Sequence, residues 1–111
     1  MIKKISVAAL LAVILLIYEG GYNSAEASAV FLGRYSDGSP AYIITQSVVI
    51  FDYRPYRFTC TIESDGDFLD YYFFSRNGRP YYRNTEGYEA YVFGGESPIA
   101  ERIYRFVVNN Y

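Results

Sequence analysis

One Asn-Gly pair with aromatic-rich sequence on both sides constrains this chain more than any other feature. Residues 68–76 precede Asn77-Gly78, and residues 79–83 follow it. Both residues of such a pair tolerate positive φ, so the pair favours a two-residue type I′ turn. The sequence therefore predicts a β-hairpin here, and with it an antiparallel sheet.

The two-residue turn also fixes the register of the predicted hairpin. Arg76 faces Arg79, and successive pairs follow as far as Tyr72 opposite Arg83. Because strand side chains alternate between faces, the residues divide into two sets. One face carries Leu69, Tyr71, Phe73 and Tyr82, and the other carries Asp70, Tyr72, Phe74, Arg76, Arg79, Tyr81 and Arg83. Burying unpaired ions is costly, so we expect the second face to meet solvent.

The N-terminal segment is typical of a secretory signal peptide. Lys3 and Lys4 precede an apolar run over residues 5–17, and Ala27-Ser28-Ala29 places small residues at positions −3 and −1 of a cleavage site. The run is shorter than the about 20 residues of a membrane span, although an uncleaved anchor is the alternative. We expect residues 1–29 to be the signal peptide, with cleavage before Val30 or alternatively before Ser28, and residues 30–111 to be one secreted domain in the periplasm or at the cell surface.

The remaining sequence predicts a small α+β domain. Strands are expected over residues 30–35, 41–45, 48–52, 56–63 and 88–93 in addition to the hairpin, and Cys60 falls on the apolar face of the strand over 56–63. We expect Cys60 to be buried, with pairing to another chain as the alternative.

The C-terminal residues predict an amphipathic helix from about Pro98 to Asn109. Ser97 is a suitable N-cap and Pro98 suits the first helical position. An apolar stripe recurs at helical spacing at Ile99, Ile103, Phe106 and Val107. A small sheet needs an apolar cover. We therefore expect a single antiparallel sheet of about six strands with this helix packed on one face; a helix lying on a membrane surface is the rival interpretation.

Composition argues against most enzyme chemistry and several classes of partner. The chain has no histidine or tryptophan, and residues 30–111 have no lysine, so the common general bases and Schiff-base chemistry are absent. Those residues hold eight arginines and ten acids, which gives no support for nucleic-acid or membrane binding. Calcium on Asp65, Asp67 and Asp70, and hydrolysis by Asp70 with Glu86 or Glu89, are weaker interpretations than ordinary solvated acids. We expect no enzyme activity, no cofactor and no metal.

The solvent-facing side of the hairpin is the candidate binding surface. Rings and arginines are enriched where proteins bind other proteins, and Tyr72 facing Arg83 suits a cation–π pair. The alternative is that cross-strand aromatic pairs only stabilise the sheet. The candidate binding residues are Tyr72, Phe74, Arg76, Arg79, Tyr81 and Arg83.

Several short segments resemble the start of small secreted bacterial proteins related to the surface-adhesin protein E family. They are Val30-Phe31-Leu32-Gly33, the Asp37-Gly38 turn, Ala41-Tyr42-Ile43 and Ser47-Val48. The resemblance implies an antiparallel sheet with a C-terminal helix packed on it, surface exposure, a tendency to dimerise and, in some members, binding of host or matrix proteins. It assigns no binding residue. We expect a non-catalytic binding or adhesion module whose partner is a protein or a matrix or envelope component, or alternatively an assembly subunit that homodimerises through the same face.

Overall fold

The computed structural model describes residues 28–111. Residues 1–27 lie outside the described part, and so does almost all of the predicted signal peptide. The order of elements is β1 (Ala29–Arg34), β2 (Pro40–Ile44), the short 3-10 helix η2 (Thr45–Ser47), β3 (Val49–Tyr53), β4 (Tyr56–Ser64), β5 (Asp67–Arg76), β6 (Arg79–Asn84), β7 (Glu89–Tyr91) and α2 (Pro98–Asn110).

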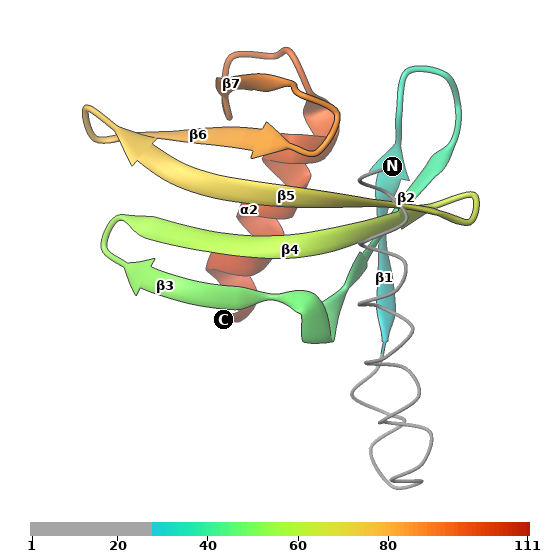
Figure 1. The fold of residues 1–111 in the computed structure, drawn as a ribbon, viewed down its shortest axis with the longest axis horizontal. Helices are drawn as coiled ribbons and strands as arrows, with labels where there is room; N and C mark the ends of the chain where they lie inside the picture. Colours follow the sequence, from blue (N-terminus) through green and yellow to red (C-terminus); the bar gives the residue numbers. More distant parts are fainter. Residues whose placement is uncertain (1–27) are drawn as a thin grey trace, which may run out of the picture.

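Residues 28–111 form one antiparallel sheet of seven strands with α2 packed on one face, which confirms the predicted α+β fold (Figure 1). The strand order is β1-β2-β4-β5-β6-β7, and β3 also pairs with β4. Because η2 separates β2 from β3, these two strands pair with different parts of the long β4. We call the sheet face that packs on α2 the inner face and the opposite one the outer face.

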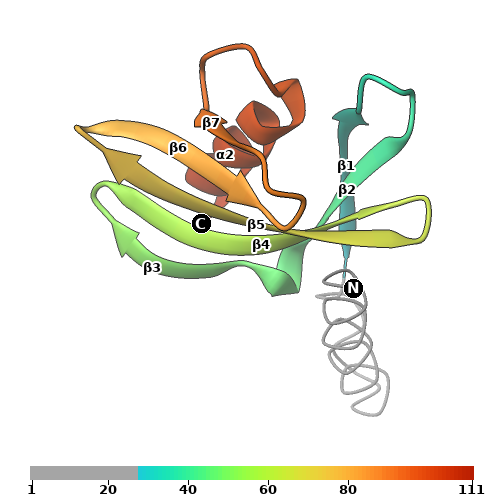
Figure 2. The same ribbon diagram turned by 45° about the horizontal axis from the view of Figure 1, so that its top comes forward.

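The β5–β6 hairpin has the predicted turn and register. Asn77 and Gly78 both have positive φ, of 55° and 78°, and the pairs run from Arg76 opposite Arg79 to Tyr72 opposite Arg83. Figures 1 and 2 place this turn at the end of the sheet far from β1 and β2. The local preference of Asn-Gly for a type I′ turn therefore decided the register of the two central strands.

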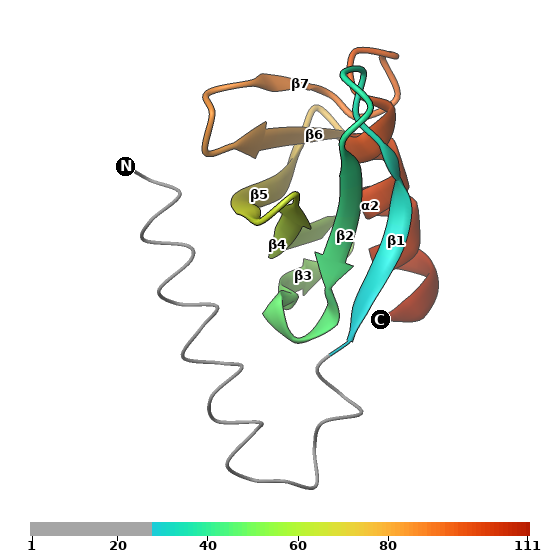
Figure 3. The same cartoon turned by 90° about the vertical axis from the view of Figure 1, so that its right-hand side faces the viewer.

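The pair of strands β1 and β2 turns away from the other strands, so that β1 also lies along α2 (Figure 3). A β-bulge between Phe31 and Gly33 accompanies this change of direction. Gly33 has φ of 143°, and a Cβ atom at this position would lie 3.0 Å from Nη1 of Arg102, which donates a 2.8 Å hydrogen bond to the carbonyl of Leu32. Glycine is therefore required where β1 meets the helix.

Helix α2 begins at the predicted residue, and its buried apolar stripe agrees with the prediction except at Phe106. The Ser97 side chain accepts a hydrogen bond of 3.1 Å from the backbone N–H of Ala100, which is an N-cap. The buried residues of the helix are Ile99, Ala100, Ile103 and Val107. Phe106 is only half-buried and lies against Tyr111, with ring centroids 6.3 Å apart, so this position of the predicted stripe is at the border of the core.

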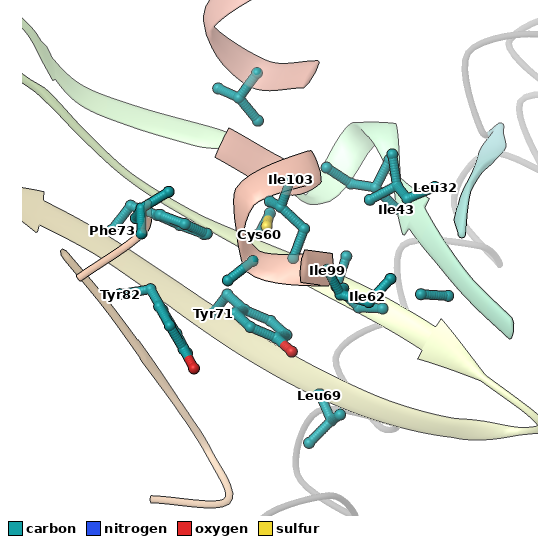
Figure 4. Close-up of a cluster of buried hydrophobic side chains, with 14 of the residues drawn as sticks. Leu32, Ile43, Cys60, Ile62, Leu69, Tyr71, Phe73, Tyr82, Ile99 and Ile103 are labelled. Carbon is teal, nitrogen blue, oxygen red and sulfur yellow. The ribbon is translucent and has the colours of Figure 1, made fainter. Parts of the chain in front are cut away.

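The core lies between α2 and the inner face of the sheet (Figure 4). Phe58 and Phe73 stack across β4 and β5 with ring centroids 4.6 Å apart, and Tyr104 of the helix packs on both rings. Cys60 is 2% exposed, which confirms that it is buried. Burial raises the pKa of its thiol above the usual range, so the group stays protonated and unreactive in the folded protein.

The first two described residues, Ser28 and Ala29, are held against the end of β2 and the start of η2. The Ser28 carbonyl accepts hydrogen bonds from the backbone N–H and the hydroxyl of Thr45, at 3.0 and 3.1 Å, and Ala29 pairs with Ile44. Cleavage before Val30 would remove these contacts, whereas the alternative cleavage before Ser28 would keep them.

If the predicted signal peptide is cleaved, we therefore expect the mature chain to begin at Ser28. A chain that starts at Val30 is expected to lose about 1–2 kcal/mol of unfolding free energy, because each hydrogen bond contributes about 0.5–1.5 kcal/mol. Intact-mass measurement of the secreted protein and urea unfolding of chains with the two starting points check this. A secreted mass that begins at Val30, with equal stability of both chains, would contradict it.

Candidate functional site

The structure places all six candidate residues on the outer face. The three arginines are exposed, while the rings of Tyr72, Phe74 and Tyr81 are half-buried. The sequence correctly predicts the side of the sheet but overestimates the exposure of the rings. We call this set of six residues the arginine–aromatic face; its part in binding stays a prediction.

The rings are half-buried because the arginine side chains lie over them. The guanidinium carbon of Arg83 is 5.8 Å from the ring centroid of Tyr72 and 5.1 Å from that of Phe74. The guanidinium carbon of Arg76 is 5.4 Å from the ring centroid of Phe74 and 4.6 Å from the ring centroid of Tyr81. The predicted cation–π pair is therefore one part of a larger array in which cations and rings alternate.

Glu89 of β7 holds two of these arginines in place. Its carboxylate accepts hydrogen bonds of 2.8 Å from Arg76 and 2.9 Å from Arg83. The hydrogen bond from Arg76, and then that from Arg83, holds the pKa of Glu89 below its usual range, so the carboxylate is ionised at neutral pH. The arginine side chains are thus ordered before any ligand arrives, which reduces the entropy that binding must overcome.

Arg79 differs from its two neighbours because it has no ion-pair partner within residues 28–111. Its guanidinium carbon lies 5.5 Å from the ring centroid of Tyr91, and Tyr91 in turn packs against Tyr81 at 5.8 Å. The face therefore contains three arginines, two of which bind the neighbouring Glu89, and Arg79 is the arginine of the face most available to a ligand. This local excess of positive charge contrasts with the negative charge of the chain.

The row of rings continues beyond β6. Tyr91 contacts Phe93 at 6.0 Å, and Phe93 contacts Tyr104 of α2 edge-on at 5.7 Å. On the β3 side, Arg57 lies 5.0 Å from the ring of Phe51. Ring contacts and cation–π contacts therefore extend to both sides of the hairpin.

A groove of about 440 Å³ opens beside Tyr72 and Arg83. Its other lining residues are mostly small or polar: Ser47, Thr59, Cys60, Thr61, Asp70, Tyr71, Asn84 and Thr85. Within it the Thr61 hydroxyl donates to Asp70 at 2.7 Å, and Ser47 accepts from the Thr61 backbone N–H at 2.7 Å. The arginine–aromatic face therefore borders a polar depression of the size that small ligands or single side chains occupy.

The acids considered for calcium binding or hydrolysis are spread over different parts of the sheet. Asp67 and Asp70 differ in parity along β5, so they lie on opposite faces of the sheet. Within residues 28–111 no group of three or more ligating side chains is placed to hold a metal ion. Glu89, one of the two partners considered for Asp70, is engaged by two arginines.

Comparison of the chain with models of protein families, with curated proteins and with solved structures gave no match. The resemblance to the surface-adhesin protein E family therefore stays a prediction. Among residues 28–111, no helix combines the length and the apolar character that a bilayer span requires.

Proposed function

We propose that this protein is a small secreted or cell-surface binding module without catalytic activity, and that the arginine–aromatic face is its binding surface. The observation that carries the proposal is the alternation of two arginines, Arg83 and Arg76, with the rings of Tyr72, Phe74 and Tyr81 on the outer face of the sheet. Arginine and tyrosine are enriched among the residues that contribute most to binding at protein interfaces.

The chemistry of this face favours a protein partner with an acidic surface. Arg79 has no ion pair within residues 28–111, whereas Arg76 and Arg83 share one carboxylate, so the face attracts negative charge. The half-buried rings supply rigid apolar area between the charges. An extracellular-matrix or cell-envelope protein that presents carboxylates beside apolar side chains would match both features.

Reversal of the charge of Arg79 tests this proposal. Arg79→Glu should weaken capture of the partner at least about tenfold, because it puts a like charge against an acidic ligand where a favourable pair stood. Arg54→Glu is the matched control, since Arg54 is also exposed but lies in the β3–β4 turn. The measurement is retention of envelope and extracellular proteins on each immobilised variant. Equal retention by Arg79→Glu and the unchanged protein would argue against the proposed surface.

An assembly role is the second candidate, and the open edge of β3 favours it. Among the described residues 28–111 this strand pairs only with β4, and its Val49, Phe51 and Tyr53 are exposed. A free strand edge next to apolar side chains is suited to pairing with a second copy. Sedimentation separates the two candidates, because a monomer at micromolar concentration excludes a stable homodimer.

A further inference from the structure

The groove beside Tyr72 and Arg83 lies over the three central strands β4, β5 and β6, which Figure 1 shows side by side. Thr59 lies opposite Tyr72, and Tyr72 lies opposite Arg83, so each of these strands contributes to the groove. Ser47 of η2 lines its β4 side, where the Ser47 hydroxyl accepts the hydrogen bond from the Thr61 backbone. Side chains on regular strands are positioned more precisely than those on loops, so the groove is largely formed before a ligand binds.

One face of the Tyr72 ring is directed toward this groove. Phe74 stacks on the ring with centroids 5.3 Å apart and an interplanar angle of 19°, so the other face of the ring is directed along β5 away from Phe74. Asp70 lies in that direction, two residues from Tyr72 on the same side of the strand, and both residues line the groove. The ring of Tyr72 therefore gives the groove a flat apolar wall.

The other side chains of the groove are rich in hydroxyl groups. The Thr61 hydroxyl donates a hydrogen bond of 2.7 Å to Asp70, and Thr85 is joined to Asp70 through its backbone N–H at 3.1 Å. Thr59 also lines the groove, one position along the same side of β4 from Thr61. A threonine hydroxyl both donates and accepts, whereas a carboxylate accepts only. Polar groups of both kinds therefore surround the Tyr72 ring.

The charges of the groove balance each other. One acid and one base, Asp70 and Arg83, are found among its lining residues. A cation in the groove would be repelled by Arg83 and an anion by Asp70, so a ligand of either charge meets one unfavourable wall. The Nε atom of Arg83 is bound to Glu89 at 2.9 Å, and the guanidinium group carries further N–H donors. The groove is therefore suited to an uncharged ligand that both donates and accepts hydrogen bonds.

A sugar ring has the matching chemistry. Its hydroxyl groups lie around the rim and its C–H groups form the faces, so it can lie on an aromatic ring while its hydroxyls meet polar side chains. The groove volume of about 440 Å³ falls within the range of about 300–1,000 Å³ that is usual for small-ligand sites. We propose that this groove binds an uncharged pyranose sugar, which stacks on Tyr72 and hydrogen-bonds to Asp70, Arg83 and the threonine hydroxyls.

An NMR titration of the mature protein tests this proposal. The probes are the methyl glycosides of glucose, galactose, mannose and N-acetylglucosamine. At least one of them should produce saturable shifts of the amide signals of Thr61, Tyr72 and Thr85. The charged relatives of the sugar that binds, its uronic acid and its amino sugar, should bind more weakly. The proposal would be overturned if no glycoside shifted these signals saturably, or if a charged relative bound as tightly as the neutral sugar.

Asp70→Asn is the main variant, because asparagine has nearly the same shape and keeps an oxygen that accepts from the Thr61 hydroxyl. It should weaken sugar binding at least about tenfold, since hydrogen bonds to a charged group are stronger than those to a neutral one. Asp65→Asn is the matched control: it makes the same change in the exposed β4–β5 turn, where asparagine tolerates the positive φ of residue 65. This control should alter affinity less than about twofold. Equal weakening by both variants would contradict the assignment of Asp70 to the site.

Two further variants separate the sugar site from the proposed protein-binding surface, with which it shares Tyr72 and Arg83. Thr59→Val removes a hydroxyl but keeps a β-branched side chain, so it should weaken sugar binding about threefold and leave capture of the protein partner unchanged. Arg79→Glu, outside the groove, should weaken capture and leave sugar binding unchanged. Unaltered sugar affinity in both Thr59→Val and Asp70→Asn would overturn the sugar site alone, whatever the result for capture by Arg79→Glu.

Discussion

Replacement of Phe73 with alanine is expected to lower the free energy of unfolding by about 3–5 kcal/mol, the usual cost of removing a fully buried phenylalanine. Phe73 is completely buried and stacks on Phe58 at 4.6 Å, with Tyr104 of α2 at 6.1 Å. The cavity would therefore lie at the contact between the helix and the central strands. Domains of this size are stable by about 5–15 kcal/mol, so the loss should be a large part of the total. Urea unfolding followed by circular dichroism measures it.

Phe74→Ala is the matched control, because Phe74 is the next residue of β5 and lies on the outer face. Its ring contacts Tyr72 and Tyr81 and lies under two arginines, but it is only half-buried. The expected cost is about 1–2 kcal/mol, from lost cross-strand and cation–π contacts. If Phe74→Ala were as destabilising as Phe73→Ala, the assignment of the two faces would be wrong.

Simultaneous replacement of Tyr72, Tyr81 and Arg83 with serine should abolish capture of the partner. Residues of these types at the centre of an interface each contribute about 2 kcal/mol or more, so a combined loss of well over a hundredfold is expected. Stability should fall less, by about 1–3 kcal/mol, because the three side chains make cross-strand and cation–π contacts on a solvated face. The Glu89 carboxylate also loses one of its two arginine partners. Capture and urea unfolding measured on the same preparation separate the two effects.

Tyr53→Ser, Tyr88→Ser and Arg54→Ser together form the control for this variant. The same residue types are changed, and both tyrosines are more than half exposed, but none of the three belongs to the arginine–aromatic face. This control should retain full capture. If the triple variant captured the partner normally, or if unfolding fully explained its loss of capture, the arginine–aromatic face would be a purely structural feature.

Local signals in the sequence were sufficient to predict the β5–β6 hairpin and the start of helix α2. Asn77-Gly78 determines a turn that admits a single register, and parity then assigns every side chain of β5 and β6 to a face. Ser97 and Pro98 likewise mark the start of α2 through the physics of the exposed N–H groups at a helix end. In these places the conformation depends on neighbouring residues alone.

The remaining parts of the candidate site depend on contacts between distant segments. Glu89 reaches Arg76 and Arg83 because β7 pairs with β6, and the longer β6–β7 connection does not fix that register as a two-residue turn does. Ser47 joins the groove only because η2 brings it against β4. No local pattern could have predicted these groupings.

The most direct measurement of the proposed binding surface is residue-level protection of the aromatic rings from hydroxyl radicals, read by mass spectrometry with and without the captured partner. If the arginine–aromatic face binds, oxidation of Tyr72, Phe74 and Tyr81 should slow in the complex, while that of the exposed Tyr53 and Tyr88 stays constant. Unchanged oxidation of Tyr72 and Tyr81, together with protection of Tyr53 or Tyr88, would contradict this account.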